Sequence, residues 1–285
     1  MSALMQSEAE IEALLMARLP SWISLQLDDP RAVVSGVARL AGGYSNETWK
    51  VRCEHSAYRA RKSTEFIVRW SPEGALFYPA DVSGQFALLK ALEPTPIPAP
   101  APLWLEPDPA VLGEPFLTMQ LVPGVSAPRV FALDDVQRDA KLTAYVQTLA
   151  GIHALDWRQF DLGSVLTAVS PESCAGVALD GVIDHVSSRG MADDAIVKRA
   201  VDWLTERVPS RSDVSLIHGD PNVSNYRFEG TSVVAVLDWD LARISDPLWD
   251  VAAYCMSMAK YFANEPRRVQ ESERRNFLGL YEEAS

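Results

Sequence analysis

Two aspartates and one asparagine in the second half of the sequence are the residues best suited to chemistry. Asp220 and Asn225 lie five positions apart in the segment Leu216–Asn225, and Asp238 directly follows an apolar run that ends at Leu237. All three side chains offer hard oxygen donors, and no histidine or cysteine lies among them at metal-ligand spacing. Such a set suits Mg²⁺ held by a few protein oxygens together with the phosphates of a substrate.

The order of residues around Asp220 also suits phosphoryl transfer. That reaction needs a metal that bridges the phosphates and a carboxylate that orients the attacking hydroxyl and accepts its proton. His218, Asp220 and Asn225 have the spacing H-x-D-x-x-x-x-N of a kinase catalytic loop, in which the aspartate is the base and the asparagine a metal ligand. A later aspartate at a strand end, here Asp238, is the second ligand. The alternative is that these residues only form turns and caps, where Asp and Asn are common.

Short strands and tight turns must bring the three side chains together. Leu216–Ile217 predicts a strand that delivers Asp220 to a loop, and a hairpin around Glu229–Gly230 joins the strands expected at Tyr226–Phe228 and Val233–Leu237. The remainder of this part shows apolar residues at helical spacing. Helices are expected at Asp134–Leu155, Asp180–Ser188, Asp194–Arg207 and Pro247–Phe262.

The first third of the sequence is rich in strands instead. A short amphipathic helix that Pro20 ends comes first, and a helix is expected over Asp81–Leu92. Alternate prolines in Pro94–Pro102 predict an extended connector. The predicted strands are Val37–Leu40, Thr48–Cys53, Phe66–Trp70, Leu103–Leu105 and Phe116–Val122. The character changes near Val122–Gly124, so we expect two domains, residues 1–122 and residues 123–285.

The pattern closely resembles the aminoglycoside phosphotransferase and choline kinase-like family, which has the bilobal protein-kinase-like fold. The resemblance covers about residues 35–262 and is carried by His218-Gly219-Asp220 with Asn225, Asp238-Trp239-Asp240 and Asp246-Pro247-Leu248-Trp249-Asp250. It implies an α+β fold with an N-terminal five-stranded antiparallel sheet, one helix and a mainly helical C-terminal lobe. It also implies Asp220 as the catalytic base, Asn225 and Asp238 as Mg²⁺ ligands, and His218 and Asp250 as supports of the loop.

The same resemblance places the nucleotide in the N-terminal lobe. Gly42, Gly43, Tyr44, Ser45 and Asn46 are similar to the loop that covers the nucleotide, and Phe66–Arg69 is similar to the third strand with its phosphate-contacting cation, here Arg69. Gln85 stands where the helix usually carries a glutamate partner for that cation, which leaves Asp81 as an alternative partner. Gln120, Leu121 and Val122 correspond to the strand whose backbone meets the adenine. ATP or GTP is therefore the implied phosphate donor.

The segment after Asp238 is too short for peptide docking, so the expected acceptor is a hydroxyl of a small molecule. An aminoglycoside would suit the acidic chain. A hydroxylated acyl or sugar metabolite is the alternative, because Ser83–Gly124 is similar to the branch that includes domains associated with acyl-CoA dehydrogenases. A catalytically silent nucleotide-binding module is a third possibility, motivated by Gln85 and by a C-terminus that is short for the family.

Composition and charge indicate which partners and which cellular compartment to expect. The 285 residues are 48% hydrophobic and 22% charged, which is typical of a soluble globular protein. The net charge of −12 repels phosphate backbones and argues against nucleic-acid binding. The sequence shows neither a signal peptide nor a run of the ~20 apolar residues that a membrane span needs. Three dispersed cysteines indicate a reducing compartment. We expect a cytoplasmic protein without a membrane partner; the oligomeric state is open.

Overall fold

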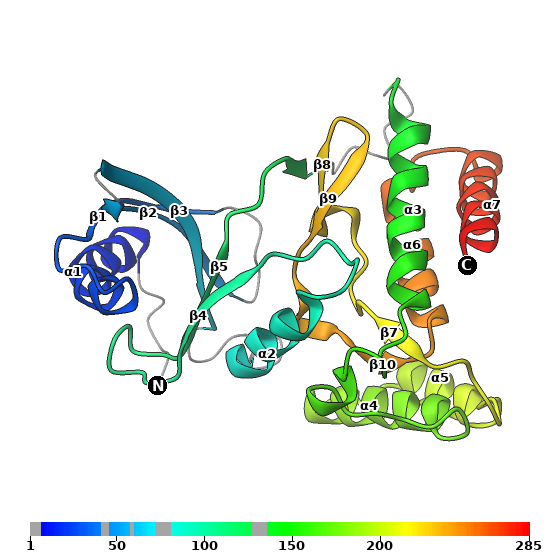
Figure 1. Ribbon diagram of the computed structural model, residues 1–285. Helices are drawn as coiled ribbons and strands as arrows, with labels where there is room; N and C mark the ends of the chain where they lie inside the picture. The colour runs from blue at the N-terminus through cyan, green and yellow to red at the C-terminus, as the bar shows by residue number, and fades with distance from the viewer. Residues whose placement is uncertain (1–6, 41–45, 58–59, 72–80, 127–135) are drawn as a thin grey trace. The chain divides into compact units, whose positions relative to one another are not determined.

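The computed structural model describes residues 7–40, 46–57, 60–71, 81–126 and 136–285. The chain divides into two compact units, Met1–Pro123 and Gly124–Ser285, which are coloured blue to green and green to red in Figure 1. Nucleotide binding by the first unit, and catalysis with acceptor binding by the second, stay predictions.

The first unit is built on a five-stranded antiparallel sheet of order β1-β2-β3-β5-β4. Its strands are β1 (Val33–Arg39), β2 (Glu47–Ala57), β3 (Ala60–Trp70), β4 (Pro102–Glu106) and β5 (Phe116–Gln120). The central strands carry the apolar runs seen in the sequence, and β5 is buried at four of its five positions. The predicted α+β class with a five-stranded antiparallel sheet is confirmed.

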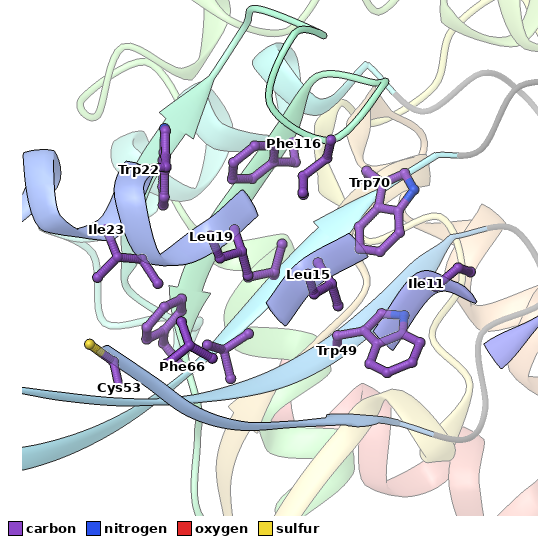
Figure 2. Packing of buried hydrophobic residues seen from close by; sticks show 14 of the residues in the cluster. Ile11, Leu15, Leu19, Trp22, Ile23, Trp49, Cys53, Phe66, Trp70 and Phe116 are labelled. Carbon is purple, nitrogen blue, oxygen red and sulfur yellow. The ribbon is translucent and has the colours of Figure 1, made fainter. Parts of the chain in front are cut away.

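The helix α1 (Glu8–Gln26) supplies much of the core of this unit (Figure 2). Its N-terminus is fixed by a capping box, in which Ser7 accepts from the Glu10 amide and Glu10 accepts from the Ser7 amide. Its buried face packs on aromatic side chains of the sheet. The members of this cluster include Ile11, Leu15, Leu19, Trp22, Ile23, Trp49, Phe66, Trp70 and Phe116.

The prediction that Pro20 ends this helix is wrong, because α1 continues to Gln26. A proline inside a helix costs about 3 kcal/mol, through the missing N–H and the clash of its ring with the preceding turn. Trp22 and Ile23 lie beyond it and are 5% and 0% exposed. Burying two large apolar side chains contributes about 1.5–3 kcal/mol each, which offsets the cost of the proline.

The helix α2 (Val82–Leu92) contacts β4 and β5. Asp81 caps it by accepting from the Ser83 amide at 3.1 Å. Its buried face is made of Val82, Gln85, Leu88, Leu89 and Leu92. Phe86, on the same helix, is only half-buried.

The second unit is mainly helical, as predicted. Its helices are α3 (Arg138–Ala154), α4 (Cys174–Ser188), α5 (Ala195–Thr205), α6 (Leu248–Tyr261) and α7 (Arg267–Ala284), with 3-10 turns at Leu162–Ser164, Val223–Asn225 and Trp239–Leu241. The sequence analysis did not predict α7. No helix among the described residues is both long and apolar enough to cross a bilayer.

Two small sheets accompany these helices. The strand β7 (Ser215–Ile217) pairs antiparallel with β10 (Arg243–Ser245), and β6 (Val125–Ser126), β8 (Tyr226–Glu229) and β9 (Ser232–Val236) form a sheet of order β6-β8-β9. β6 and β10 were not predicted. The helix α3 contacts β7, β9 and α7, and it buries Tyr145, Val146, Leu149 and Ile152 along one side. The ends of β7 and β9 are thereby held on a common apolar support.

Candidate active site

The segment His218–Asn225, here named the Asp220 loop, follows the buried strand β7. Gly219 makes its sharp first turn with a φ of +85°. A Cβ atom at this position would lie 2.2 Å from the carbonyl oxygen of Leu241, so the close approach of the two backbones requires glycine. The backbone therefore turns sharply at Gly219, directly before Asp220.

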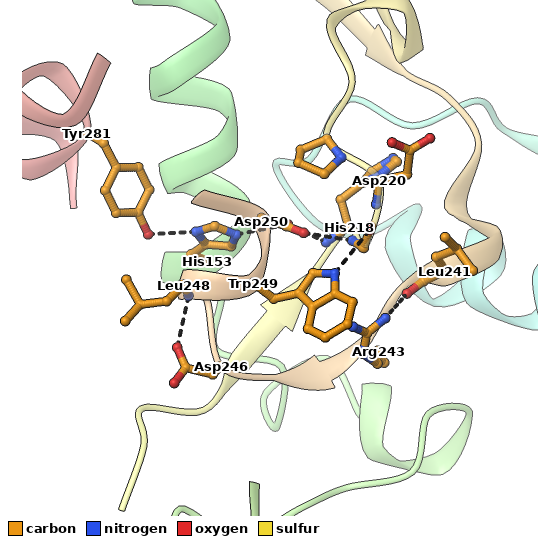
Figure 3. Close-up of polar contacts among 12 residues, drawn as sticks. His153, His218, Asp220, Leu241, Arg243, Asp246, Leu248, Trp249, Asp250 and Tyr281 are labelled. Atoms are coloured by element: carbon orange, nitrogen blue, oxygen red, sulfur yellow. Dashed lines mark hydrogen bonds and ion pairs between the residues drawn. The ribbon is translucent and has the colours of Figure 1, made fainter. Parts of the chain in front are cut away.

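Asp250 holds the start of the Asp220 loop (Figure 3). Its side chain is 0% exposed; Oδ2 accepts from the His218 amide at 2.7 Å, and Oδ1 accepts from the Gly219 amide at 2.9 Å. Burial raises the pKa of this carboxyl, but the hydrogen bond to His153 and the amide of His218 outweigh it, so the pKa lies below its usual value. An ionised carboxylate thus fixes the two peptide groups that precede Asp220.

His218 braces the loop from inside. The residue is 0% exposed, its Nδ1 accepts from the Asp220 amide at 3.3 Å, and its Nε2 lies 2.8 Å from the Leu237 carbonyl oxygen. Because Nδ1 accepts, the proton is on Nε2, which donates to Leu237. The ring thereby ties the amide of Asp220 to the residue that precedes Asp238.

Asn225 lies directly against Asp220. Its side-chain Nδ2 donates to the Asp220 carbonyl oxygen at 3.0 Å and to Oδ2 of the Asp220 carboxylate at 3.2 Å. The Asn225 carbonyl oxygen accepts from the Leu237 amide at 2.7 Å. The structure therefore brings these two predicted site residues together and joins their loop to the end of β9.

Asp238 follows β9 in a left-handed backbone conformation, with φ of 64° and ψ of 59°. A residue other than glycine seldom adopts this conformation, and such residues concentrate at functional sites. The preceding residue, Leu237, makes the two bonds described above, one to His218 and one to Asn225. The residue directly before Asp238 is therefore bonded to both ends of the Asp220 loop.

The donor set fits a hard divalent cation. In the part of the chain that the structure describes, no group of three or more His, Cys, Asp or Glu side chains is placed to hold a metal. A metal at this loop would thus depend on the amide oxygen of Asn225 together with carboxylates, which is an oxygen-only set of few ligands. Mg²⁺ is commonly held in that way, with substrate phosphates and water completing its coordination.

Two supporting residues were missed by the sequence analysis. Tyr145 of α3 is fully buried and donates its hydroxyl to the Pro221 carbonyl oxygen at 2.6 Å, and burial raises the pKa of this phenol. Trp249 donates its indole N–H to the Gly219 carbonyl oxygen at 3.3 Å. Both act on the backbone of the Asp220 loop, and local sequence patterns carry no signal for such contacts.

Residues predicted to bind the nucleotide lie on β3 and α2 of the first unit. Arg69 lies on β3, between Thr48 of β2 and Leu117 of β5. Gln85 of α2 is 7% exposed, which is unusual for a glutamine in a helix. Asp81, the alternative partner for the cation, is used as the N-cap of α2.

The other predicted nucleotide residues are distributed as follows. Gln120 ends β5 and donates its amide to the Ala101 carbonyl oxygen at 2.8 Å. Leu121 and Val122 follow it and are half-buried. Asn46 is 8% exposed at the start of β2. Gly42, Gly43, Tyr44 and Ser45 lie outside the described residues.

The sequence and the fold are similar to those of known proteins along most of the chain. A family profile described as the phosphotransferase enzyme family matches residues 36–284. A curated relative, acyl-CoA dehydrogenase family member 10 of Mus musculus, is 30% identical over 227 residues, which are 75% of this chain and 20% of the relative. The chain thus spans about a fifth of the length of that mouse protein.

Solved structures show the same fold. The apoenzyme of macrolide 2'-phosphotransferase MphH from Brachybacterium faecium aligns with a TM-score of 0.60 at 18% identity, over 95% of this chain and 83% of that one. A thermostable mutant of aminoglycoside phosphotransferase APH(4)-Ia, in a ternary complex with ADP and hygromycin B, aligns with a TM-score of 0.59 at 15% identity. That alignment covers 92% of this chain and 88% of the other.

Proposed function

The chain belongs to the phosphotransferase enzyme family, and we propose that it moves the γ-phosphate of ATP or GTP to a hydroxyl of a small molecule, with Asp220 as catalytic base. That it is a small-molecule phosphotransferase follows from the family. The single observation that carries the role of Asp220 is its pairing with Asn225 on a loop whose backbone is fixed by a buried carboxylate. This is the arrangement that positioning and proton removal require.

Asp220 would orient the acceptor hydroxyl and take its proton. Asn225 donates to Oδ2 of Asp220, so we assign the other oxygen, Oδ1, to the acceptor hydroxyl. The Asn225 contact also prevents rotation of the carboxylate, because it bonds the Asp220 main chain and side chain together. A fixed carboxylate within reach of the hydroxyl contributes about 10²–10⁴-fold to the rate as a general base.

Asn225 and Asp238 would hold Mg²⁺. Asn225 uses its Nδ2 on Asp220, which leaves its amide oxygen to act as a ligand. The bonds from Leu237 to Asn225 and His218 join the residue before Asp238 to the loop that carries Asn225. A Mg²⁺ ion held by these residues would supply the positive charge that stabilises the phosphates during transfer.

Arg69 would contact the α- and β-phosphates of the donor, and the backbone of Gln120–Val122 would meet its base. An arginine is always charged and can bind phosphate oxygens in pairs, so it is a suitable replacement for lysine at this position. The related fold bound to ADP supports a nucleotide donor.

The names of the related proteins bear on the acceptor. One related structure is a macrolide phosphotransferase and the other an aminoglycoside phosphotransferase with hygromycin B bound, whereas the mouse relative is named an acyl-CoA dehydrogenase family member. Its identity of 30% exceeds the 18% and 15% of the two structures. This difference favours a hydroxylated acyl or sugar metabolite over an antibiotic.

A phosphorylation screen tests the proposal. The full chain is incubated with Mg²⁺ and ATP or GTP, and ³¹P NMR follows the γ-phosphate with hygromycin B, a macrolide, hydroxy acids, hydroxyacyl thioesters and sugars. Transfer by the wild type that falls at least 10²-fold in Asp220→Asn supports the base. The matched control, Asp213→Asn, changes an exposed aspartate next to β7 and should leave the rate unchanged.

Two outcomes contradict the proposal. Full turnover by Asp220→Asn on a confirmed acceptor excludes Asp220 as the base. Nucleotide binding without transfer to any acceptor, and without hydrolysis, would instead identify a catalytically silent nucleotide-binding module.

A further inference from the structure

A single histidine links the C-terminal helix to the Asp220 loop. His153 lies in the last turn of α3; its Nε2 is 3.1 Å from Oδ2 of Asp250, and its Nδ1 is 2.7 Å from the hydroxyl oxygen of Tyr281 on α7. Figure 3 shows Tyr281, His153, Asp250 and His218 in a row. The helix α7 is therefore joined by side-chain bonds to the carboxylate that holds the loop.

The hydrogen-bond pattern assigns the proton on the His153 ring. An ionised carboxylate only accepts, so His153 Nε2 carries the proton that is shared with Asp250. Nδ1 is then bonded to the Tyr281 hydroxyl, as an acceptor if the ring is neutral and as a donor if it is protonated. Tyr281 and Asp250 thereby fix the orientation of the ring from its two nitrogens.

The His153 ring and the Asp250 carboxylate are shielded from water. The His153 side chain is 4% exposed and the Asp250 side chain is 0% exposed. Water has little access to the ring, so loss of the Tyr281 hydroxyl would leave Nδ1 of His153 without its partner in a buried place. The ring would then turn or shift to find another partner, and its bond to Asp250 would move with it.

The docking of α7 does not depend on the Tyr281 hydroxyl. Phe277 is fully buried and stacks on Tyr254 of α6, with ring centroids 3.8 Å apart. Glu273 forms an ion pair with Arg138 of α3, and both side chains are largely buried. Removal of the hydroxyl alone would therefore keep α7 in place and break only the link to His153.

We propose that Tyr281 is a positioning residue for phosphoryl transfer: its hydroxyl fixes the His153 ring, the ring fixes the Asp250 carboxylate, and the carboxylate fixes the two peptide groups before Asp220. Tyr281 acts through His153 and Asp250, not on the reacting atoms. The proposal rests on the function proposed above for Asp220, but its structural link can be measured without turnover.

The test compares Tyr281→Phe with Phe277→Leu in the full chain. Tyr281→Phe removes one hydroxyl, and kcat should fall about fivefold while KM for donor and acceptor stays within about twofold. Phe277→Leu removes ring stacking but keeps the hydroxyl. It should lower Tm more than Tyr281→Phe does, with kcat unchanged at temperatures well below Tm.

A second readout needs no activity. NMR hydrogen exchange in the protein without ligands reports the Gly219 amide, which Asp250 holds, and the ¹⁵N shifts of the His153 ring report its tautomer. Tyr281→Phe should speed exchange of the Gly219 amide about fivefold or more and shift the His153 Nδ1 resonance. Phe277→Leu should leave the Nδ1 shift unchanged.

The outcomes distinguish a failure of the positioning role of Tyr281 from a failure of the proposed phosphotransfer function. In an active enzyme, wild-type kcat in Tyr281→Phe overturns it, and so does an equal fall of kcat in Phe277→Leu. If the wild type transfers no phosphate, the proposed function is wrong, and hydrogen exchange alone tests the link from Tyr281 to the Asp220 loop. Faster exchange at Gly219 in Tyr281→Phe then supports the link from α7 to the loop, and unchanged exchange overturns it.

Discussion

The substitution Asp250→Asn gives the sharpest test of how the Asp220 loop is held. The carboxylate accepts from the amides of His218 and Gly219 at 2.7 and 2.9 Å and from His153 at 3.1 Å. An asparagine has only one acceptor oxygen. If that oxygen replaces Oδ2, the new NH₂ group faces the amide of Gly219, and two donors meet in a fully buried place.

The expected loss follows from these contacts. One charge-assisted hydrogen bond is worth about 1.5–3 kcal/mol, and an unpaired buried N–H costs about 1–3 kcal/mol. The bonds from His218 and His153 also change from charged to neutral. Together these two effects lead us to expect a fall of about 3–5 kcal/mol in the free energy of unfolding.

Urea unfolding followed by circular dichroism measures this loss, and hydrogen exchange at Gly219 locates it. The control is Asp246→Asn in the same segment, where Asp246 accepts from the Leu248 amide at 2.9 Å at the start of α6. Asparagine caps helices about as well as aspartate, so the control should lose less than about 0.5 kcal/mol. A loss below about 1 kcal/mol in Asp250→Asn, or an equal loss in the control, would refute the reasoning.

Two other predictions concern the same loop. Folding lowers the pKa of Asp250, so its contribution to stability is complete above the unfolded pKa of about 4 and is lost as the pH falls through the folded pKa. Asp250→Asn should therefore reduce the loss of stability at acidic pH. An unchanged loss of stability in acid would exclude this account. Gly219→Ala should destabilise the protein by at least about 2 kcal/mol more than Gly230→Ala, because both glycines have positive φ but only Gly219 meets a backbone oxygen; equal Tm values for the two variants would exclude the steric argument.

The parts of the fold that were predictable have strong local patterns. Apolar alternation and turn residues predicted five antiparallel strands, and the spacing of His218, Asp220 and Asn225 predicted a loop that the structure does bring together. The strand β10 has three residues and exists only because β7 pairs with it. Such short strands depend on tertiary pairing, which a local pattern does not contain.

The sequence-based predictions of helix α7 and of the end of α1 failed for a related reason. α7 buries Phe277 alone among its residues and is otherwise largely polar, so its apolar periodicity is weak. Pro20 is a strong local stop signal, yet burial of Trp22 and Ile23 in the core overrides it. The contacts of His153 with Asp250 and Tyr281 join residues 97 and 128 positions apart, and sequence spacing does not reveal such contacts.

The most direct test of the central claim is a calorimetric titration of ATP into the full chain with Mg²⁺ or with EDTA. The variant is Asp238→Asn, which tolerates the left-handed backbone, and the control is Asp246→Asn. We predict that the affinity for ATP falls at least tenfold when Mg²⁺ is removed, and that Asp238→Asn abolishes this dependence while Asp246→Asn keeps it. Equal ATP affinity with Mg²⁺ and with EDTA, or full Mg²⁺ dependence in Asp238→Asn, would contradict a magnesium-dependent phosphotransfer site at this loop.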